Sequence, residues 1–419
     1  MMNRWDHLIK SLGPGLLIAA AAIGVSHLVQ STRAGADYGL GLVWAVLLAN
    51  IFKYPFLEYG PRYAIAAGET MIEGYRRLGT WAIGFFLFFT VSTMFIIYAA
   101  VTVVTASLAA ELTGIPLNPF LWSGILLLIC FAIMYSGEYS VLDKIIKIVV
   151  AVLALSTVVA VLAALFQGGH QTLQAVDPPT IWSVSGVAFL IALMGWMPIP
   201  IDAAAWHSIW TMERIKQTGY TPKLRESLTD FNIGYIGAAV LAVCFLLLGA
   251  FVMFGTGETF ASSGAGFAGQ LINLYTSHLG SWSYPIIIVS AFTVMFSTTL
   301  AVTDAYPRTV RKFIEVLKPD LYRKTSPATL YRLILFITAT SSLSILYFLS
   351  SQFTFMVDLA ATLSFLGAPL LGYLNYRLVM MPHIAQEHRP KPWLRRLTVG
   401  GLLFLTGFAL LYLYWMVRF

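Results

Sequence analysis

Three ionisable side chains, His27, Asp202 and His207, lie in strongly apolar stretches of the sequence, and the thioether Met197 precedes Asp202 by five residues. Imidazole and thioether suit late transition metals, whereas carboxylate oxygens suit harder cations. Together with freed backbone carbonyls, His27, Met197 and Asp202 could form one mixed nitrogen, sulfur and oxygen site for a metal ion. The same groups could equally form a site for an organic anion or zwitterion, whose carboxylate would face the N-terminus of a half-helix.

Further charged residues follow in another apolar stretch. Lys53 stands between Phe52 and Tyr54, and Glu58 follows five positions later. Ionisable groups inside a membrane span are rare and are candidates for function. We expect Lys53 either to pair with Glu58 or to stabilise a helix interface. Lys53, Glu58 and His207 are therefore candidates for coupling or gating.

The composition shows which elements must position these groups. Hydrophobic residues make up 58% of the 419 positions and charged residues 11%, and the mean hydropathy is +0.78. Soluble domains are nearer 45–50% apolar and about 25% charged. The chain is therefore expected to be a polytopic helical membrane protein. Its two cysteines, Cys130 and Cys244, lie in apolar runs and predict no disulfide framework.

A bilayer core of about 30 Å needs roughly 20 apolar residues per helix. Windows of that length predict about eleven spans. They are Pro14–Ser31, Leu40–Tyr63, Trp81–Ala110, Phe120–Tyr135, Lys144–Phe166, Val184–Met212, Phe231–Phe254, Tyr284–Thr303, Leu330–Leu349, Phe353–Arg377 and Thr398–Val417.

Most lysine and arginine residues lie in or beside alternate connections between these spans. The connections without either residue are Glu111–Pro119, Gln167–Ile181, Gly255–Ser283 and Ser350–Gln352. Cationic loops favour the cytoplasm, which predicts a cytoplasmic N-terminus and an external C-terminus. The first ten residues show no cleavable signal pattern, so the first apolar run is expected to remain as a span. The net charge of +7 is thus a topology signal, and no nucleic-acid partner is expected.

Two spans are interrupted. The first holds glycine, serine and histidine between Ala22 and His27, and the sixth holds Pro198 and Pro200 just before Asp202. Proline removes a backbone donor and clashes with the preceding turn. Broken helices at corresponding positions of two halves indicate the central site of a transporter. We expect both spans to be unwound, near Gly24–His27 and Gly195–Ile201, and to face each other.

Several motifs resemble the Nramp family of divalent-metal transporters. They are the runs Gly13–Ala20 and Gln30–Gly39 of the first span, followed by Leu47–Asn50, Gly114–Leu117, Met197-Pro198 and His207-Ser208. The resemblance covers nearly the whole chain. It implies an all-α, LeuT-like fold with two inverted repeats of five spans, an extra eleventh helix and alternating access. Residues 1–419 would form a single transporter domain, with repeats at about 11–167 and 182–380 and the extra helix at about 396–418.

The chain departs from the family in its binding motifs. The family reads Asp-Pro-Gly-Asn at the centre of span one, whereas this chain reads Gly24-Val-Ser-His27. Met197 matches the family's sulfur ligand, and Asp202 could restore the missing carboxylate from span six. The resemblance places Gly24, His27, Met197 and Asp202 at the substrate. The family's acidic pair in span three falls on Tyr98 and Val101, which leaves its proton route without those acids.

Two functions follow as hypotheses. The first is a secondary transporter that imports a divalent metal cation, with protons as the candidate coupling ion. The second is an Nramp-related carrier of a small organic solute, such as an amino acid or carboxylate, coupled to protons or sodium. A sensor or scaffold is disfavoured because no soluble regulatory domain is visible, and the chain has no His-Glu-x-x-His or Gly-x-Ser-x-Gly motif of an enzyme.

The expected partners are the lipid bilayer and the transported solute or ion, with no cofactor and no obligate protein partner. A divalent metal ion would be substrate. The expected location is the bacterial inner or plasma membrane.

Overall fold

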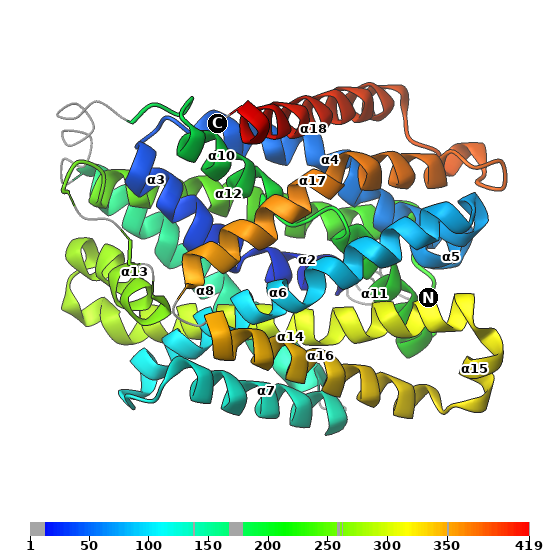
Figure 1. Cartoon of the computed structure of the whole chain (residues 1–419), viewed down its shortest axis with the longest axis horizontal. Coiled ribbons are helices and arrows are strands. Elements are labelled where there is room, and N and C mark those ends of the chain that lie inside the picture. Colours follow the sequence, from blue (N-terminus) through cyan, green and yellow to red (C-terminus); the bar gives the residue numbers. More distant parts are fainter. Residues whose placement is uncertain are drawn as a thin grey trace, which may run out of the picture.

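Helices dominate the computed structural model, which describes residues 13–136, 139–166, 179–257, 260–261, 263–349 and 352–418; for the first part of the helix that begins at Tyr139 it describes the backbone only. No strand occurs within these ranges. The helices run roughly along the long axis of the molecule and pack side by side (Figure 1). Because a bilayer core offers no water to backbone groups, each span must satisfy its own hydrogen bonds, which helices do.

Within the described residues, eleven helical segments correspond to the spans that the sequence predicts. Span one consists of α2 (Pro14–Ala22), the π-helix η1 (Ser26–Ser31) and α3 (Thr32–Tyr38), and span six consists of α10 (Val184–Trp196) and α11 (Ala203–Thr218). The other spans are α4 (Val43–Ala67), α6 (Thr80–Thr113), α7 (Pro119–Ser136), α8 (Tyr139–Phe166), α12 (Leu224–Val252), α14 (Tyr284–Leu317), α16 (Pro327–Leu349), α17 (Phe353–Val379) and α18 (Pro392–Arg418).

Length and composition support this assignment. Among the described residues, α6, α12, α14, α16, α17 and α18 are each long and apolar enough to cross a membrane. The two halves of span one qualify together, bent by 41°. The predicted fold class, a LeuT-like bundle with broken first and sixth spans, is confirmed.

Helix α12 packs closely against both halves of span one. A Cβ atom at Gly234 would lie 2.2 Å from the carbonyl oxygen of Gly15 in α2, and one at Gly249 would lie 2.2 Å from that of Thr32 in α3. Small residues let membrane helices approach this closely, so van der Waals contact can hold them together. The two glycines of α12 thus support span one on either side of its break.

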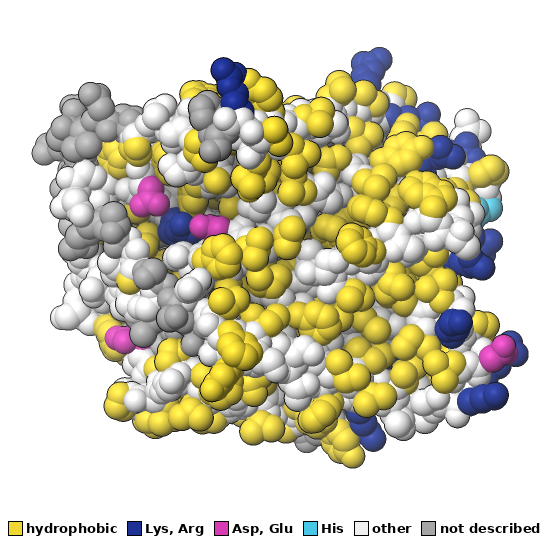
Figure 2. Space-filling view, viewed as in Figure 1, with side chains coloured by type: hydrophobic (Ala, Val, Ile, Leu, Met, Phe, Trp, Pro, Cys, Tyr) yellow, Lys and Arg dark blue, Asp and Glu magenta, His cyan; other side chains and the backbone are white. Residues whose placement is uncertain are grey.

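Basic side chains gather at one end of the molecule. Figure 2 shows Lys and Arg at the end where α5 (Met71–Leu78) and α15 (Pro319–Lys324) lie in Figure 1. Arg4 and Lys10, which the sequence assigns to the same side, lie outside the described residues, as do the side chains of Lys144 and Lys147. The described basic connections at α5 and α15 therefore share one face.

The short helix α5, between spans two and three, is fixed to α14 by one carboxylate. Glu73 accepts a 2.7 Å hydrogen bond from the Thr70 backbone N–H and lies 2.9 Å from Lys312 Nζ. Burial on its own would raise the pKa of Glu73, but the hydrogen bonds from Lys312 and Thr70 outweigh it and hold the pKa below its usual range. Glu73 therefore links α5 to α14 in its ionised form.

Candidate functional site

The break in span one is short. Helix α2 ends at Ala22, and the π-helix η1 begins at Ser26, so His27 lies within a helical turn rather than in the unwound stretch expected at Gly24–His27. Glycine is required at position 24 because a Cβ there would lie 2.6 Å from Thr298 Oγ1 of α14. The close approach of α14 therefore accounts for Gly24 without any ligand.

The break in span six is longer. Helix α10 ends at Trp196 and α11 begins at Ala203, so Met197–Asp202 form the irregular segment, and all of it is buried. The peptide bond between Met197 and Pro198 is cis. Gly195, expected to be unwound, is still helical. The prolines at 198 and 200 fall inside the break, as their chemistry predicts.

The two breaks lie against each other. The Ser26 hydroxyl donates to the Pro198 carbonyl oxygen at 3.0 Å, and Ser31 Oγ lies 4.0 Å from Met197 Sδ. The Ser26 hydroxyl is also 2.6 Å from the Ala22 carbonyl oxygen and 2.7 Å from His27 Nδ1. The hydroxyl has one proton and can donate it to only one of these acceptors at a time. Ser26 can therefore bond within span one or across to span six.

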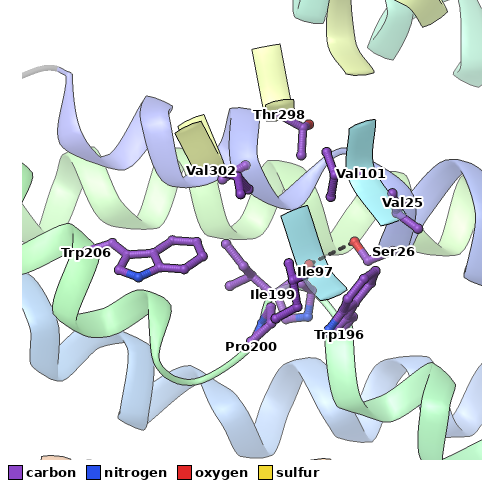
Figure 3. Close-up of a pocket in the computed structure, with 12 residues that line it drawn as sticks. Val25, Ser26, Ile97, Val101, Trp196, Ile199, Pro200, Trp206, Thr298 and Val302 are labelled. Atoms are coloured by element: carbon purple, nitrogen blue, oxygen red, sulfur yellow. Dashed lines mark hydrogen bonds between the residues drawn. The ribbon is translucent and has the colours of Figure 1, made fainter. Parts of the chain in front are cut away.

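A small cavity lies where the breaks meet (Figure 3). Its volume is about 30 Å³, enough for one or two water molecules, since each needs at least about 10–15 Å³. In Figure 3, Ser26 and Trp196 lie at one end of the cavity and Trp206 at the other. The lining is largely apolar and comes from spans one, three, six and eight: Ala21, Val25, Ser26, Ile97, Val101, Trp196, Pro198, Ile199, Pro200, Trp206, Thr298 and Val302.

His27 is tied to α12 rather than to span six. Its Nε2 lies 2.8 Å from the Ala238 carbonyl oxygen, and its Nδ1 lies 2.7 Å from Ser26 Oγ. A carbonyl can only accept, so Nε2 carries a proton. Both ring nitrogens are thus occupied, and binding a metal through His27 would require the release of one of these bonds. None of the recorded hydrogen bonds or ion pairs of His27 reaches Asp202.

Asp202 is a buried acid at the start of α11. It is 2% exposed, and neither carboxylate oxygen has a hydrogen-bond partner. It interacts electrostatically with Lys53 of α4, Tyr75 of α5 and Tyr306 of α14. A buried carboxylate without hydrogen bonds is costly to fold, so Asp202 remains a candidate functional residue.

Lys53 and Glu58 do not pair with each other. The fully buried Lys53 ammonium donates to the carbonyl oxygens of Met194 at 3.3 Å and Gly195 at 2.9 Å. Glu58 instead forms a bidentate ion pair with Arg62, one turn further along α4. Of the two alternatives for Lys53, the structure supports the second: Lys53 bonds across the interface between α4 and α10 and does not pair with Glu58.

His207 of α11 is buried, and neither of its ring nitrogens has a hydrogen-bond partner. Its ring lies 5.8 Å from that of Phe231 in α12, centroid to centroid. Within the described part of the chain, no three His, Cys, Asp or Glu side chains cluster closely enough to hold a metal ion. The ligand candidates at the breaks are Met197 Sδ, the Asp202 carboxylate, hydroxyl groups and backbone carbonyls.

The sequence did not reveal a second polar site between spans one and ten. Arg33 of α3 forms two hydrogen bonds with Asp358 of α17, at 2.8 and 3.3 Å, and Gln30 donates to the same carboxylate at 2.8 Å. The Arg33 guanidinium lies 4.9 Å from the centre of the Phe189 ring of α10. Arg33, Phe189 and Asp358 line a cavity of about 460 Å³. Figure 2 shows acidic side chains on either side of a basic one in a hollow of the surface.

Comparison with known proteins extends this description. The family model "Natural resistance-associated macrophage protein-like" (Nramp) matches residues 15–415. An uncharacterized protein of Pasteurella multocida (strain Pm70) is 36% identical over 98% of this chain and 93% of its own length. A divalent metal cation transporter, MntH, of Latilactobacillus sakei is 23% identical over 60% of this chain and 56% of its own length.

Among solved structures, the manganese transporter of Eremococcus coleocola, in complex with an aromatic bis-isothiourea substituted compound, superposes with a TM-score of 0.72. The match covers 98% of this chain and 88% of that chain at 15% identity. A likeness at this identity concerns the fold.

Proposed function

This chain belongs to the Nramp family, and on that premise we propose that it is a secondary transporter that carries a small solute across the membrane by alternating access. The observation that carries the proposal is the contact between spans one and six at their breaks, Ser26 on Pro198 and Ser31 beside Met197, next to a cavity that Ser26 and Pro198 line. Transporters of this architecture bind substrate between paired broken helices.

The first candidate substrate is a divalent metal cation, imported together with protons. Family membership and the relative named as a divalent metal cation transporter support it. Met197 would supply a soft sulfur ligand, the breaks would supply carbonyl oxygens, and Asp202 would supply the negative charge that the first span lacks. A site of this composition favours late transition metals over magnesium.

The second candidate is a small organic solute, coupled to protons or sodium. A specific observation favours it: the cavity lining is largely apolar, and the described residues hold no cluster of metal-ligating acids, histidines or cysteines. Walls formed by Trp196 and Trp206 suit the apolar part of an organic molecule, because ligand pockets are mostly apolar with a few polar groups.

The membrane orientation belongs to the same proposal. The basic connections at α5 and α15 would face the cytoplasm of a bacterium, which places the N-terminus inside and the C-terminus outside. The cavity at Arg33 and Asp358 would then open toward the exterior.

Uptake into proteoliposomes tests both candidates side by side. Manganese, other divalent metals, amino acids and small carboxylates would be offered with and without proton or sodium gradients. A metal carrier takes up manganese with saturation, and Met197→Leu, which conserves volume but removes the sulfur, weakens that uptake. Saturable uptake of an organic solute without metal uptake would reject the first candidate, and uptake of neither class would reject the carrier proposal.

A further inference from the structure

The C-terminal end of α10 binds a positively charged side chain, Lys53, which belongs to another helix, α4. The last four carbonyl groups of a helix have no partner within it, and the helix dipole makes that end negative. In a soluble protein water would satisfy these groups, but a membrane span has none to offer. At the end of α10, two of them, those of Met194 and Gly195, accept hydrogen bonds from the Lys53 ammonium of α4.

The surroundings of the Lys53 ammonium match those of a bound cation. It is fully buried and contacts two backbone carbonyl oxygens. Asp202, across the break, interacts with it electrostatically without forming an ion pair or hydrogen bond, and neither of its carboxylate oxygens has another hydrogen-bond partner. Carbonyl and carboxylate oxygens are the groups that bind small cations, and in transporters with broken helices the ends of half-helices bind the coupling ion.

We propose that Lys53 is a tethered cation: its ammonium occupies a cation site formed by the end of α10 and Asp202, and thereby takes the place of a free ion. Only the link between this site and transport rests on the proposed function. The cation site itself is a property of the folded chain. Without the lysine, the same oxygens form a site for a small free monovalent cation. With the lysine present, no free cation is needed there to hold the two halves of span six together.

Chemical rescue tests the proposal on purified full-length protein. Lys53→Ala removes four heavy atoms, three carbons and the nitrogen, which are those of propylammonium. We expect Lys53→Ala to have a lower melting temperature than wild type and to recover with added propylammonium chloride. The recovery should rise with the logarithm of the concentration above the dissociation constant, as for a ligand that binds only the folded state. Choline chloride at equal ionic strength, too large for the space, should give no recovery.

Two controls separate the effect of the positive charge from the effect of filling the empty volume. Wild type and Lys53→Met, whose side chain fills the space without a charge, should not respond to propylammonium. If Lys53→Ala responds no more than wild type, or responds equally to choline, the cation site does not exist.

A second measurement applies even if Lys53→Ala cannot be purified. Lys53→Met and Asp202→Asn should each lower the melting temperature, because each leaves one buried charge without its counter-charge. The double variant should then lose less than the sum of the two single losses. Additive losses would show that Asp202 is not the counter-charge and would overturn the proposal. Both tests are independent of transport, so a protein that carries no solute could still pass them.

Discussion

Replacing His27 with alanine separates a structural role for this histidine from a role as a ligand. The change removes the bonds from the ring to the Ala238 carbonyl and to Ser26. Hydrogen bonds inside membrane proteins contribute about 0.6 kcal/mol on average and up to about 1.7 kcal/mol. The cavity left by the ring adds roughly 1–2 kcal/mol. We therefore expect His27→Ala to lower the free energy of unfolding by about 2–4 kcal/mol.

His207→Ala is a matched control, because His207 is equally buried but its ring has no hydrogen-bond partner. It should lose only the packing contribution, so the two variants should differ by the two bonds, about 1–3 kcal/mol. Thermal unfolding in detergent, followed by the loss of monodisperse protein on size exclusion, measures both. If His27→Ala is no less stable than His207→Ala yet loses uptake, the ring does not hold span one to α12, and our interpretation of His27 is wrong.

Three further predictions concern other parts of the molecule. Gly234→Ala forces a Cβ to 2.2 Å from a backbone oxygen of α2 and should cost about 1–3 kcal/mol of stability. The control Gly237→Ala, at an exposed position of the same helix, should be neutral or stabilising. Equal melting temperatures of the two variants would contradict the close packing. Glu73→Gln should lower the melting temperature at pH 7. The pKa of Glu73 is lowered in the folded protein, so its contribution to stability is present above the unfolded pKa and is lost as the pH falls through the folded pKa. The difference between wild type and Glu73→Gln should therefore disappear at acidic pH, below the ordinary range of a glutamate pKa, and a constant difference would refute this. Met197→Leu should weaken metal uptake and leave the melting temperature nearly unchanged, and unaltered metal uptake would remove Met197 from the site.

Hydropathy and backbone chemistry predicted the fold well. Spans of about 20 apolar residues follow from the bilayer thickness. Two prolines close together before an acid, Pro198 and Pro200, indicated the break in span six, whereas the single prolines Pro55 and Pro307 lie inside continuous helices. Both breaks are where Pro198, Pro200 and Gly24 indicate, although the first is shorter because η1 resumes a helical turn at Ser26.

The direction of individual side chains could not be predicted in the same way. A break interrupts the helical periodicity, so the sequence did not indicate that His27 faces Ala238 of α12. Lys53 and Gly195 are 142 positions apart, and Arg33 and Asp358 are 325 apart, and no local pattern links such pairs. Most residues that line the cavity, Trp196 and Trp206 among them, are apolar and cannot be told from packing residues by type.

Cysteine accessibility tests the central claim, alternating access around the cavity between the breaks, most directly. Val25 lines that cavity and is buried, so Val25→Cys would be introduced into a variant without Cys130 and Cys244. A membrane-impermeant maleimide would be applied to the protein in right-side-out and inside-out vesicles, with Leu128→Cys, on the exposed surface of α7, as an unreactive control. The account predicts labelling of position 25 from each side, slowed when transported solute saturates the site. Labelling from only one side under all conditions, or from neither, would contradict alternating access through this cavity.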